Sequence, residues 1–227
     1  LDLQPLVPIT TYAEMDEKMS KVLDKLRQHP DYPGLYKKAF GTEEITSAKT
    51  MKALSQFMLM CVSSNSKYDK VMRKEGEKFT KEEEQGYKLF QQKCSGCHAE
   101  PFFTDQSFRN NGIAIGRNDD RGRFTITLDT LDAYKFKVPS LRNIDVTAPY
   151  MHDGRYYGLD KILDHYRYGV QNTPNLDPLL KQNGQLGIPM TDEEKARIIT
   201  FLKTLNDPQF LKNPLLAEQE FLLNYDK

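Results

Sequence analysis

Residues 94 to 98 read Cys94-Ser95-Gly96-Cys97-His98, and this short stretch decides both the fold and the chemistry. The pattern C-x-x-C-H is the attachment signature of c-type haem. Its spacing has a physical reason, because one helical turn presents two thiols to the two haem vinyl groups and the next residue delivers an imidazole to the iron. The motif therefore predicts one covalent haem c, held by Cys94, Cys97 and His98.

Two other interpretations of the cysteine pair use the same spacing. C-x-x-C also occurs in redox dithiols and as half of a zinc site. Zinc would need two further soft or imidazole ligands, and the remaining candidates show no second paired spacing: Cys61, His29, His152 and His165. Haem is therefore favoured, and Cys61, on an apolar helix face, is expected to be a small buried hydrophobe.

The composition excludes several classes of protein. The chain has 227 residues, a length of one to two domains. Its 32 Lys and Arg balance 32 Asp and Glu, which gives no electrostatic reason to expect a nucleic-acid partner. The mean hydropathy is −0.66 and no apolar run is long enough for a membrane span. The first residues lack the basic and apolar regions of a signal peptide, so we expect a chain that is either mature or without its front.

Helical signals flank the motif on both sides. Apolar periodicity predicts helices over residues 10–28 and 46–62. Capping boxes that start at Thr80 and Thr191 open two more helices. The helices after these two boxes look like the first and last helices of a cytochrome c fold, which cross closely at a glycine, here Gly86.

Residues 104–150 are irregular, with short β-like runs such as 123–126. A stretch this long counts against a compact domain unless something other than secondary structure organises it. A buried prosthetic group would do so. We therefore expect an all-α fold with a cytochrome c-like haem domain whose long irregular loops wrap the haem.

A longer element resembles the signature of bacterial di-haem cytochrome c peroxidases. It consists of FKVPSLRNI at residues 136–144 and TAPYMHDG at residues 147–154. The spacing from Gln4 through Met15 also matches the family's Q-x-x-x-P-x-x-x-x-x-E-M stretch. The resemblance covers residues 1–206.

Family members carry two C-x-x-C-H motifs, whereas this chain has one. The resemblance implies that residues 1–79 are the helical remainder of a partial first cytochrome domain, the peroxidatic one. Residues 80–206 would be the electron-transfer haem domain and 207–227 a C-terminal tail. A second haem is then expected upstream, with Gln4 and Glu14 as residues of its pocket.

The sixth ligand of the iron is not decided by spacing. The candidates are Met151, His152, His165, Tyr166 and Met190. Tyr166 stands where many family members place an axial methionine, and this resembles the MauG-type enzyme that matures the tryptophan-derived quinone of methylamine dehydrogenase. A phenolate favours ferric over ferrous iron, so a Tyr166-ligated haem should have a low potential. His165, a methionine or an open position are the alternatives.

The resemblance implies a periplasmic c-type haem oxidoreductase that reduces hydrogen peroxide to water with electrons from a small redox protein. Glu14 would shuttle a proton between the peroxide oxygens, and Gln4 would orient the oxygen or its water. Periplasmic location follows because the thioethers of haem c are formed outside the cytoplasmic membrane. The alternatives are a mono-haem electron-transfer domain without catalysis and a MauG-like oxidase of a partner protein.

The same resemblance implies further properties: a calcium site, a homodimer and a role for His152. The backbone carbonyls of Thr147 and Pro149 match positions that bind calcium in the family. Family members are often dimers, which makes a homodimer an expectation of the resemblance alone. His152 is expected to be a structural or interhaem residue rather than a ligand.

Overall fold

The computed structural model describes residues 1–217, which form two compact units, each mainly helical. Of the described residues, the first unit comprises Leu1–Val62 and 212–217, and the second comprises Ser63–Leu211. The predicted all-α class is confirmed in its main feature, although four two-residue strands occur. Within the described residues, no helix combines the length and the apolar character needed to cross a bilayer.

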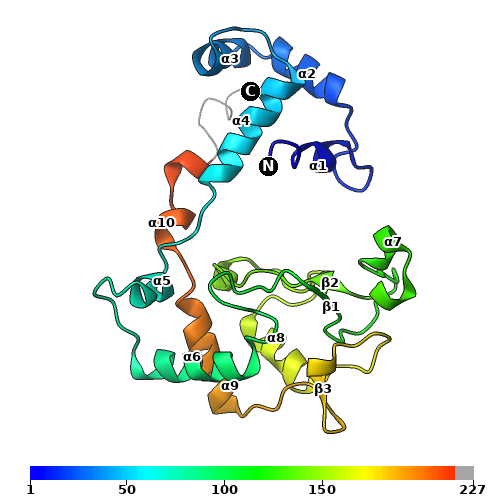
Figure 1. Cartoon of the computed structure of the whole chain (residues 1–227), viewed down its shortest axis with the longest axis vertical. Coiled ribbons are helices and arrows are strands. Elements are labelled where there is room, and N and C mark those ends of the chain that lie inside the picture. Colours follow the sequence, from blue (N-terminus) through cyan, green and yellow to red (C-terminus); the bar gives the residue numbers. More distant parts are fainter. Residues whose placement is uncertain (218–227) are drawn as a thin grey trace. The chain divides into compact units, whose positions relative to one another are not determined.

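The first unit is built on a small core of Leu23, Tyr36 and Ile45. The Tyr36 hydroxyl and the Thr50 hydroxyl lie 2.8 Å apart, which satisfies the buried end of the ring. The elements are α1 (Leu6–Thr10), α2 (Met19–Gln28), α3 (Tyr32–Phe40), α4 (Ser47–Met60) and, near the described C-terminal end, the 3-10 turn η5 (Pro214–Leu216) (Figure 1).

The predicted helix over residues 10–28 is wrong at its start. The chain leaves helical geometry after Thr10, and Asp16 has a φ of 47°. Glu17 then accepts a hydrogen bond from the Lys18 backbone N–H at 2.9 Å, just before α2 begins. Local polar contacts therefore end one helix and start another where periodicity alone suggests continuity. The helix predicted over 46–62 is confirmed as α4, with Thr46 as its N-cap.

The expectation that Cys61 is buried is also wrong. Cys61 follows the last turn of α4 and is exposed. The apolar face of α4 is longer than the core beneath it, so Met51 is buried while Leu54 and Phe57 are 37% and 46% exposed.

The second unit is organised by two crossing helices, α6 (Lys81–Lys93) and α9 (Asp192–Lys203), seen in green and orange in Figure 1. Both predicted capping boxes are present. The helices meet at Gly86, where an added Cβ would overlap the Arg197 carbonyl and lie 3.0 Å from the Phe201 Cβ. The glycine therefore permits a backbone-to-backbone approach that any other residue would prevent.

Short elements complete the second unit. The remaining helices and turns are α5 (Lys67–Met72), α7 (Phe124–Thr127), η1 (Thr130–Asp132), η2 (Ile144–Val146), α8 (Leu159–Asp164), the π-helical turn η3 (His165–Gly169), η4 (Pro178–Leu180) and α10 (Pro208–Leu211). The antiparallel strand pairs are β1 (Phe108–Arg109) with β2 (Phe136–Lys137), and β3 (Lys181–Gln182) with β4 (Gln185–Leu186).

The predicted β-like run at 123–126 is instead the single helical turn α7. The Arg121 guanidinium lies 3.9 Å from the centroid of the Phe124 ring. The backbone N–H groups of Thr127 and Leu128 donate to the carbonyls four residues earlier, at 3.1 Å and 2.8 Å, which is the α-helical pattern and not that of an extended strand.

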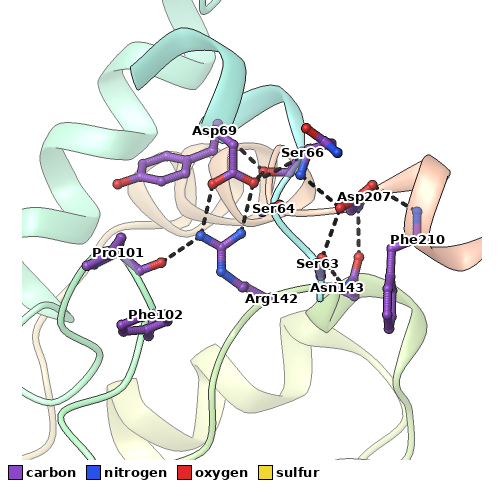
Figure 2. Close-up of polar contacts among 12 residues, drawn as sticks. Ser63, Ser64, Ser66, Asp69, Pro101, Phe102, Arg142, Asn143, Asp207 and Phe210 are labelled. Carbon is purple, nitrogen blue, oxygen red and sulfur yellow. Dashed lines mark hydrogen bonds and ion pairs between the residues drawn. The ribbon is translucent and has the colours of Figure 1, made fainter. Parts of the chain in front are cut away.

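The division between the units differs from the predicted boundary at 79/80, because residues 63–79 pack in the second unit. Tyr68 is 4% exposed and belongs to the second unit's core. Its neighbour Asp69 accepts two hydrogen bonds from the Arg142 guanidinium, both 2.9 Å long (Figure 2). A tertiary ion pair over 73 residues of sequence thus holds in the second unit a segment that the prediction assigns to the first domain.

A second polar cluster surrounds Asp207, which is 1% exposed. Its Oδ2 accepts a hydrogen bond from the Ser63 hydroxyl at 3.2 Å, and its backbone N–H donates to Asn143 Oδ1 at 2.7 Å (Figure 2). Asn143 Nδ2 in turn donates to the Ser63 hydroxyl at 3.0 Å. The two ends of the second unit are therefore tied together by one buried carboxylate.

Candidate haem site

The second unit encloses a cavity of about 880 Å³, in the size range of about 300–1,000 Å³ that is typical of cofactor pockets. Its walls are mostly apolar and include Phe90, Leu141, Ile144, Leu159, Leu163, Ile198 and Leu202. Protein interiors are otherwise close-packed, so an apolar space of this size is suited to a large, mainly apolar group.

The C-x-x-C-H motif forms part of the wall of this cavity. Cys94, Cys97 and His98 all line it. The backbone N–H groups of Cys97 and His98 donate to the Cys94 carbonyl at 3.2 Å and 3.0 Å, so the motif is a compact turn at the end of α6. The turn gathers two thiols and one imidazole at one cavity, as covalent haem attachment requires.

His98 is prepared to act as a metal ligand. Its Nδ1 lies 3.1 Å from the Phe103 carbonyl, and burial lowers the pKa of His98. Hydrogen bonds with the Phe103 and Pro139 backbone oppose this lowering. A lowered pKa favours the neutral imidazole, which is the form that binds a metal ion.

The pKa values of the two thiols are shifted in the opposite direction from those of a redox dithiol. Burial raises the pKa of Cys94 to about 12 and also raises the pKa of Cys97. Reactive dithiols instead have lowered pKa values. Zinc also lacks support, because residues 1–217 hold no group of three or more His, Cys, Asp or Glu side chains suited to a metal ion.

Comparisons with known proteins show the family to which the chain belongs. The crystal structure of a MauG-like protein associated with microbial copper homeostasis superposes with a TM-score of 0.81 at 30% identity, covering 96% of this chain and 71% of that one. The family described as di-haem cytochrome c peroxidase matches residues 1–77. The chain belongs to the di-haem cytochrome c peroxidase family.

Two curated relatives in this family have different names. The methylamine utilization protein MauG of Methylorubrum extorquens is 34% identical over 220 residues, which are 95% of this chain and 61% of the relative. The cytochrome c551 peroxidase of Nitrosomonas europaea is 31% identical over 215 residues, covering 92% of this chain and 60% of the relative. The chain thus spans about three fifths of either relative. Membership in the di-haem peroxidase family implies c-type haem as cofactor.

Four of the five candidate sixth ligands line the cavity. They are Met151, His152, Tyr166 and Met190. His165 does not line it, because its ring is 3% exposed and its Nε2 lies 3.0 Å from the Asn111 carbonyl. His152 is exposed and stacks on Phe136 at 3.9 Å, so its ring has another partner.

Tyr166 lies in the π-helical turn η3, a conformation that often occurs at functional sites. Its carbonyl accepts a hydrogen bond from the Ile188 backbone N–H at 2.7 Å. A Cβ at Gly187 would lie 2.6 Å from the same carbonyl, so the glycine permits this approach. Burial raises the pKa of Tyr166 to about 12, and the Asn111 side chain opposes that shift. A bound metal ion would favour the phenolate by its own charge.

Two further residues at the cavity could not be predicted from the sequence. Arg109 lines the cavity and donates to Asp105 at 2.7 Å and to Asp177 at 2.8 Å. Although burial raises the pKa of Asp105, hydrogen bonds from Ser107 and Arg109 bring it down to about 2. Asn111 contacts both His165 and Met151. Neither residue is part of a periodic pattern, and three of their partners lie 40 or more residues away.

The other predicted residues fall in both units. Gln4 and Glu14 flank α1 in the first unit, and both are exposed. Thr147 and Pro149 line the cavity of the second unit. The roles predicted for these four residues stay predictions.

Proposed function

We propose that residues 63–211 form the electron-transfer haem domain of a periplasmic oxidoreductase that reduces hydrogen peroxide to water with electrons from a small redox protein. The observation that carries the proposal is one cavity lined by Cys94, Cys97, His98 and Tyr166. Family membership supports the peroxidase chemistry, since cytochrome c551 peroxidase is among the relatives.

In this proposal each cavity residue has a defined task. Cys94 and Cys97 would attach haem c through thioethers, and His98 and Tyr166 would bind the iron. A haem held there supplies one-electron oxidation and reduction. Arg109 keeps the turn after Cys97 in place, because it donates both to Asp105 and to the Gly96 carbonyl. The apolar walls exclude water from the iron.

Peroxide would react at a second haem, on a segment upstream of this chain in the complete protein. Glu14 would take the proton from one peroxide oxygen and return it to the leaving oxygen, and Gln4 would orient the peroxide. The Thr147 and Pro149 carbonyls would contribute to a calcium site, and the protein would form a homodimer.

One observation favours a second candidate, a MauG-like oxidase that acts on a partner protein. Tyr166 lines the cavity, and by the resemblance it takes the place where many family members have an axial methionine. The similarity to the MauG protein of Methylorubrum extorquens agrees with this alternative.

The test is the haem count by intact mass and haemochrome absorbance, on protein expressed from the uninterrupted reading frame in a host that matures c-type cytochromes. We expect two haems, one of which is lost in the Cys94→Ala/Cys97→Ala variant, and peroxide-dependent oxidation of a reduced small cytochrome. A single haem with no reaction would leave a mono-haem electron-transfer protein. Oxidation of a partner protein without turnover of the small cytochrome would favour the MauG-like alternative.

A further inference from the structure

Two tyrosines outside the cavity share one carboxylate. The Tyr68 hydroxyl donates to Glu100 Oε1 at 2.7 Å, and the Tyr87 hydroxyl donates to Glu100 Oε2 at 3.2 Å. The two rings lie 6.1 Å apart in an edge-to-face arrangement. Each phenol thus has its own acceptor oxygen on a single side chain.

Aromatic rings connect this pair to the haem cavity along two routes. Phe90 lines the cavity, and its ring lies 5.1 Å from Phe201 and 5.5 Å from Phe103. Phe201 lies 5.1 Å from Tyr87, and Phe103 lies 4.8 Å from Tyr68. Each tyrosine is therefore two ring contacts from a ring in the cavity wall.

The spacing along α6 gives a second measure of how close Tyr87 lies to the haem attachment site. Tyr87 and Cys94 lie seven residues apart on or next to α6, which corresponds to about 10 Å along the helix axis. The tyrosine and the thioether that would hold the haem are thus separated by two turns of packed backbone.

The frame around the pair is rigid. Arg142 donates to the Asp69 carboxylate and, at 2.8 Å, to the Pro101 carbonyl (Figure 2). Asp69 follows Tyr68 in the chain and Pro101 follows Glu100, so one guanidinium fixes the backbone beside both the donor and the acceptor. Tyr68 is 4% exposed, whereas Tyr87 is partly exposed, so the pair leads from the core toward the surface.

Both phenols stay protonated at neutral pH. Burial is the main cause that raises the pKa of Tyr87 to about 12, and burial and Glu100 raise the pKa of Tyr68 as well. A protonated phenol is oxidised readily only when a base can accept its proton during the loss of the electron, and such a base is in hydrogen-bond contact here.

We propose that Tyr68 and Tyr87 form a redox-active pair beside the haem cavity. One phenol would give a single electron to a c-type haem that hydrogen peroxide has oxidised above its ferric state, and that haem would be reduced by one electron. The phenolic O–H bond breaks, and the proton moves along the existing hydrogen bond to the Glu100 carboxylate. A neutral tyrosyl radical remains, and it is shared by the two rings until an external reductant returns the electron and Glu100 returns the proton.

The proposal rests on the proposed function for its oxidant, and the experiment separates the two. The haem-loaded protein is oxidised in one arm with a ruthenium polypyridyl photosensitiser and persulfate, and in the other with hydrogen peroxide. Freeze-quenched samples of protein containing ring-deuterated tyrosine are examined by electron paramagnetic resonance. We expect a tyrosyl signal that falls by more than half in Tyr68→Phe and Tyr87→Phe and nearly vanishes in the double variant.

Tyr157→Phe is the control, because Tyr157 belongs to the same unit but is 77% exposed. It should leave the signal unchanged, and haem absorption should show that every variant retains its haem. Equal signals in the photochemical arm for the wild type and the double variant would overturn the tyrosine pair. A signal in the photochemical arm with no spectral response to peroxide would keep the pair and remove the peroxidase function.

Discussion

In the proposed function Tyr166 is a ligand of the haem iron, and the chemistry of the cavity then depends on it. Replacing it with methionine exchanges a hard anionic donor for a soft neutral one, which favours ferrous iron. Tyr166→Met should therefore raise the midpoint potential by on the order of 100 mV, within the range of about 0.8 V that axial ligands span. Redox titration followed by visible absorption measures the change. Unchanged spectrum and potential would remove Tyr166 as a ligand, and Tyr156→Phe is the control for a nearby phenol.

The Asp69–Arg142 pair is the second prediction for single residues. Asp69→Asn removes the charge but keeps the volume, and it leaves Arg142, whose side chain is 15% exposed, without its partner. Breaking such a pair costs about 3–5 kcal/mol in the free energy of unfolding. Urea unfolding measures the loss. Asp160→Asn is the control, because that carboxylate is 53% exposed and should contribute less than about 1 kcal/mol. Equal effects of the two substitutions would contradict the prediction.

The same pair gives a pH dependence. Burial raises the pKa of Asp69, but hydrogen bonds from Arg142 and Ser66 outweigh burial and hold the pKa below its usual value. Because the folded-state pKa is lowered, the contribution to stability is present above the unfolded pKa of about 3.9. It is lost as the pH falls through the folded-state pKa. Unfolding free energies measured from pH 6 down to pH 3 should therefore decline less steeply in Asp69→Asn than in the wild type.

At the scale of elements, the crossing of α6 and α9 depends on one position. Gly86→Ala would place a methyl group against the Arg197 carbonyl, so the helices must separate. Overpacking of this kind costs about 1–3 kcal/mol, occasionally more, despite the better helix propensity of alanine. Thermal unfolding of the haem-loaded chain should show the loss. Gly34→Ala within α3 is the matched control, because nothing lies within 4 Å of its added Cβ, and it should be neutral or stabilising.

The elements that could be predicted from sequence are those set by neighbouring residues. The capping boxes at Thr80 and Thr191 use contacts three residues apart, and both occur as predicted. The break after Thr10 and the placement of Tyr68 in the second unit depend on φ angles and on partners far along the chain. Such interactions leave no periodic signal in the sequence.

The residues of the site can also be predicted only where a local pattern marks them. The C-x-x-C-H motif and Tyr166 are predicted from local pattern and family resemblance, and the structure brings them to one cavity. Arg109 and Asn111 are missed, because Asp177 lies 68 residues from Arg109 and His165 lies 54 residues from Asn111. When the partners of a polar side chain are this distant in the sequence, local patterns do not distinguish it from an ordinary surface residue.

For the whole molecule, stability should depend on the filling of the cavity. Without covalent haem, about 880 Å³ of mainly apolar space would collapse or fill with water, and either change weakens the second unit. Cys94→Ala/Cys97→Ala should therefore lose the near-ultraviolet circular dichroism of the second unit's aromatic core and unfold at lower urea concentration. Cys61→Ala is the control, since that thiol is exposed and lies in the first unit. Identical unfolding curves for the two variants would show that the haem does not support the fold.

The hydrogen bonds around the buried carboxylate of Asp207 indicate where an expressed fragment of the chain should begin and end. The second unit is a continuous insertion within the first, and its two ends are fastened to each other by the hydrogen bonds among Ser63, Asn143 and Asp207. A fragment that keeps these three residues retains the hydrogen bonds that join its two ends. We therefore expect that it can be expressed alone or inserted into another host protein. A cut at residue 80 would discard Ser63 and open the fragment at its base.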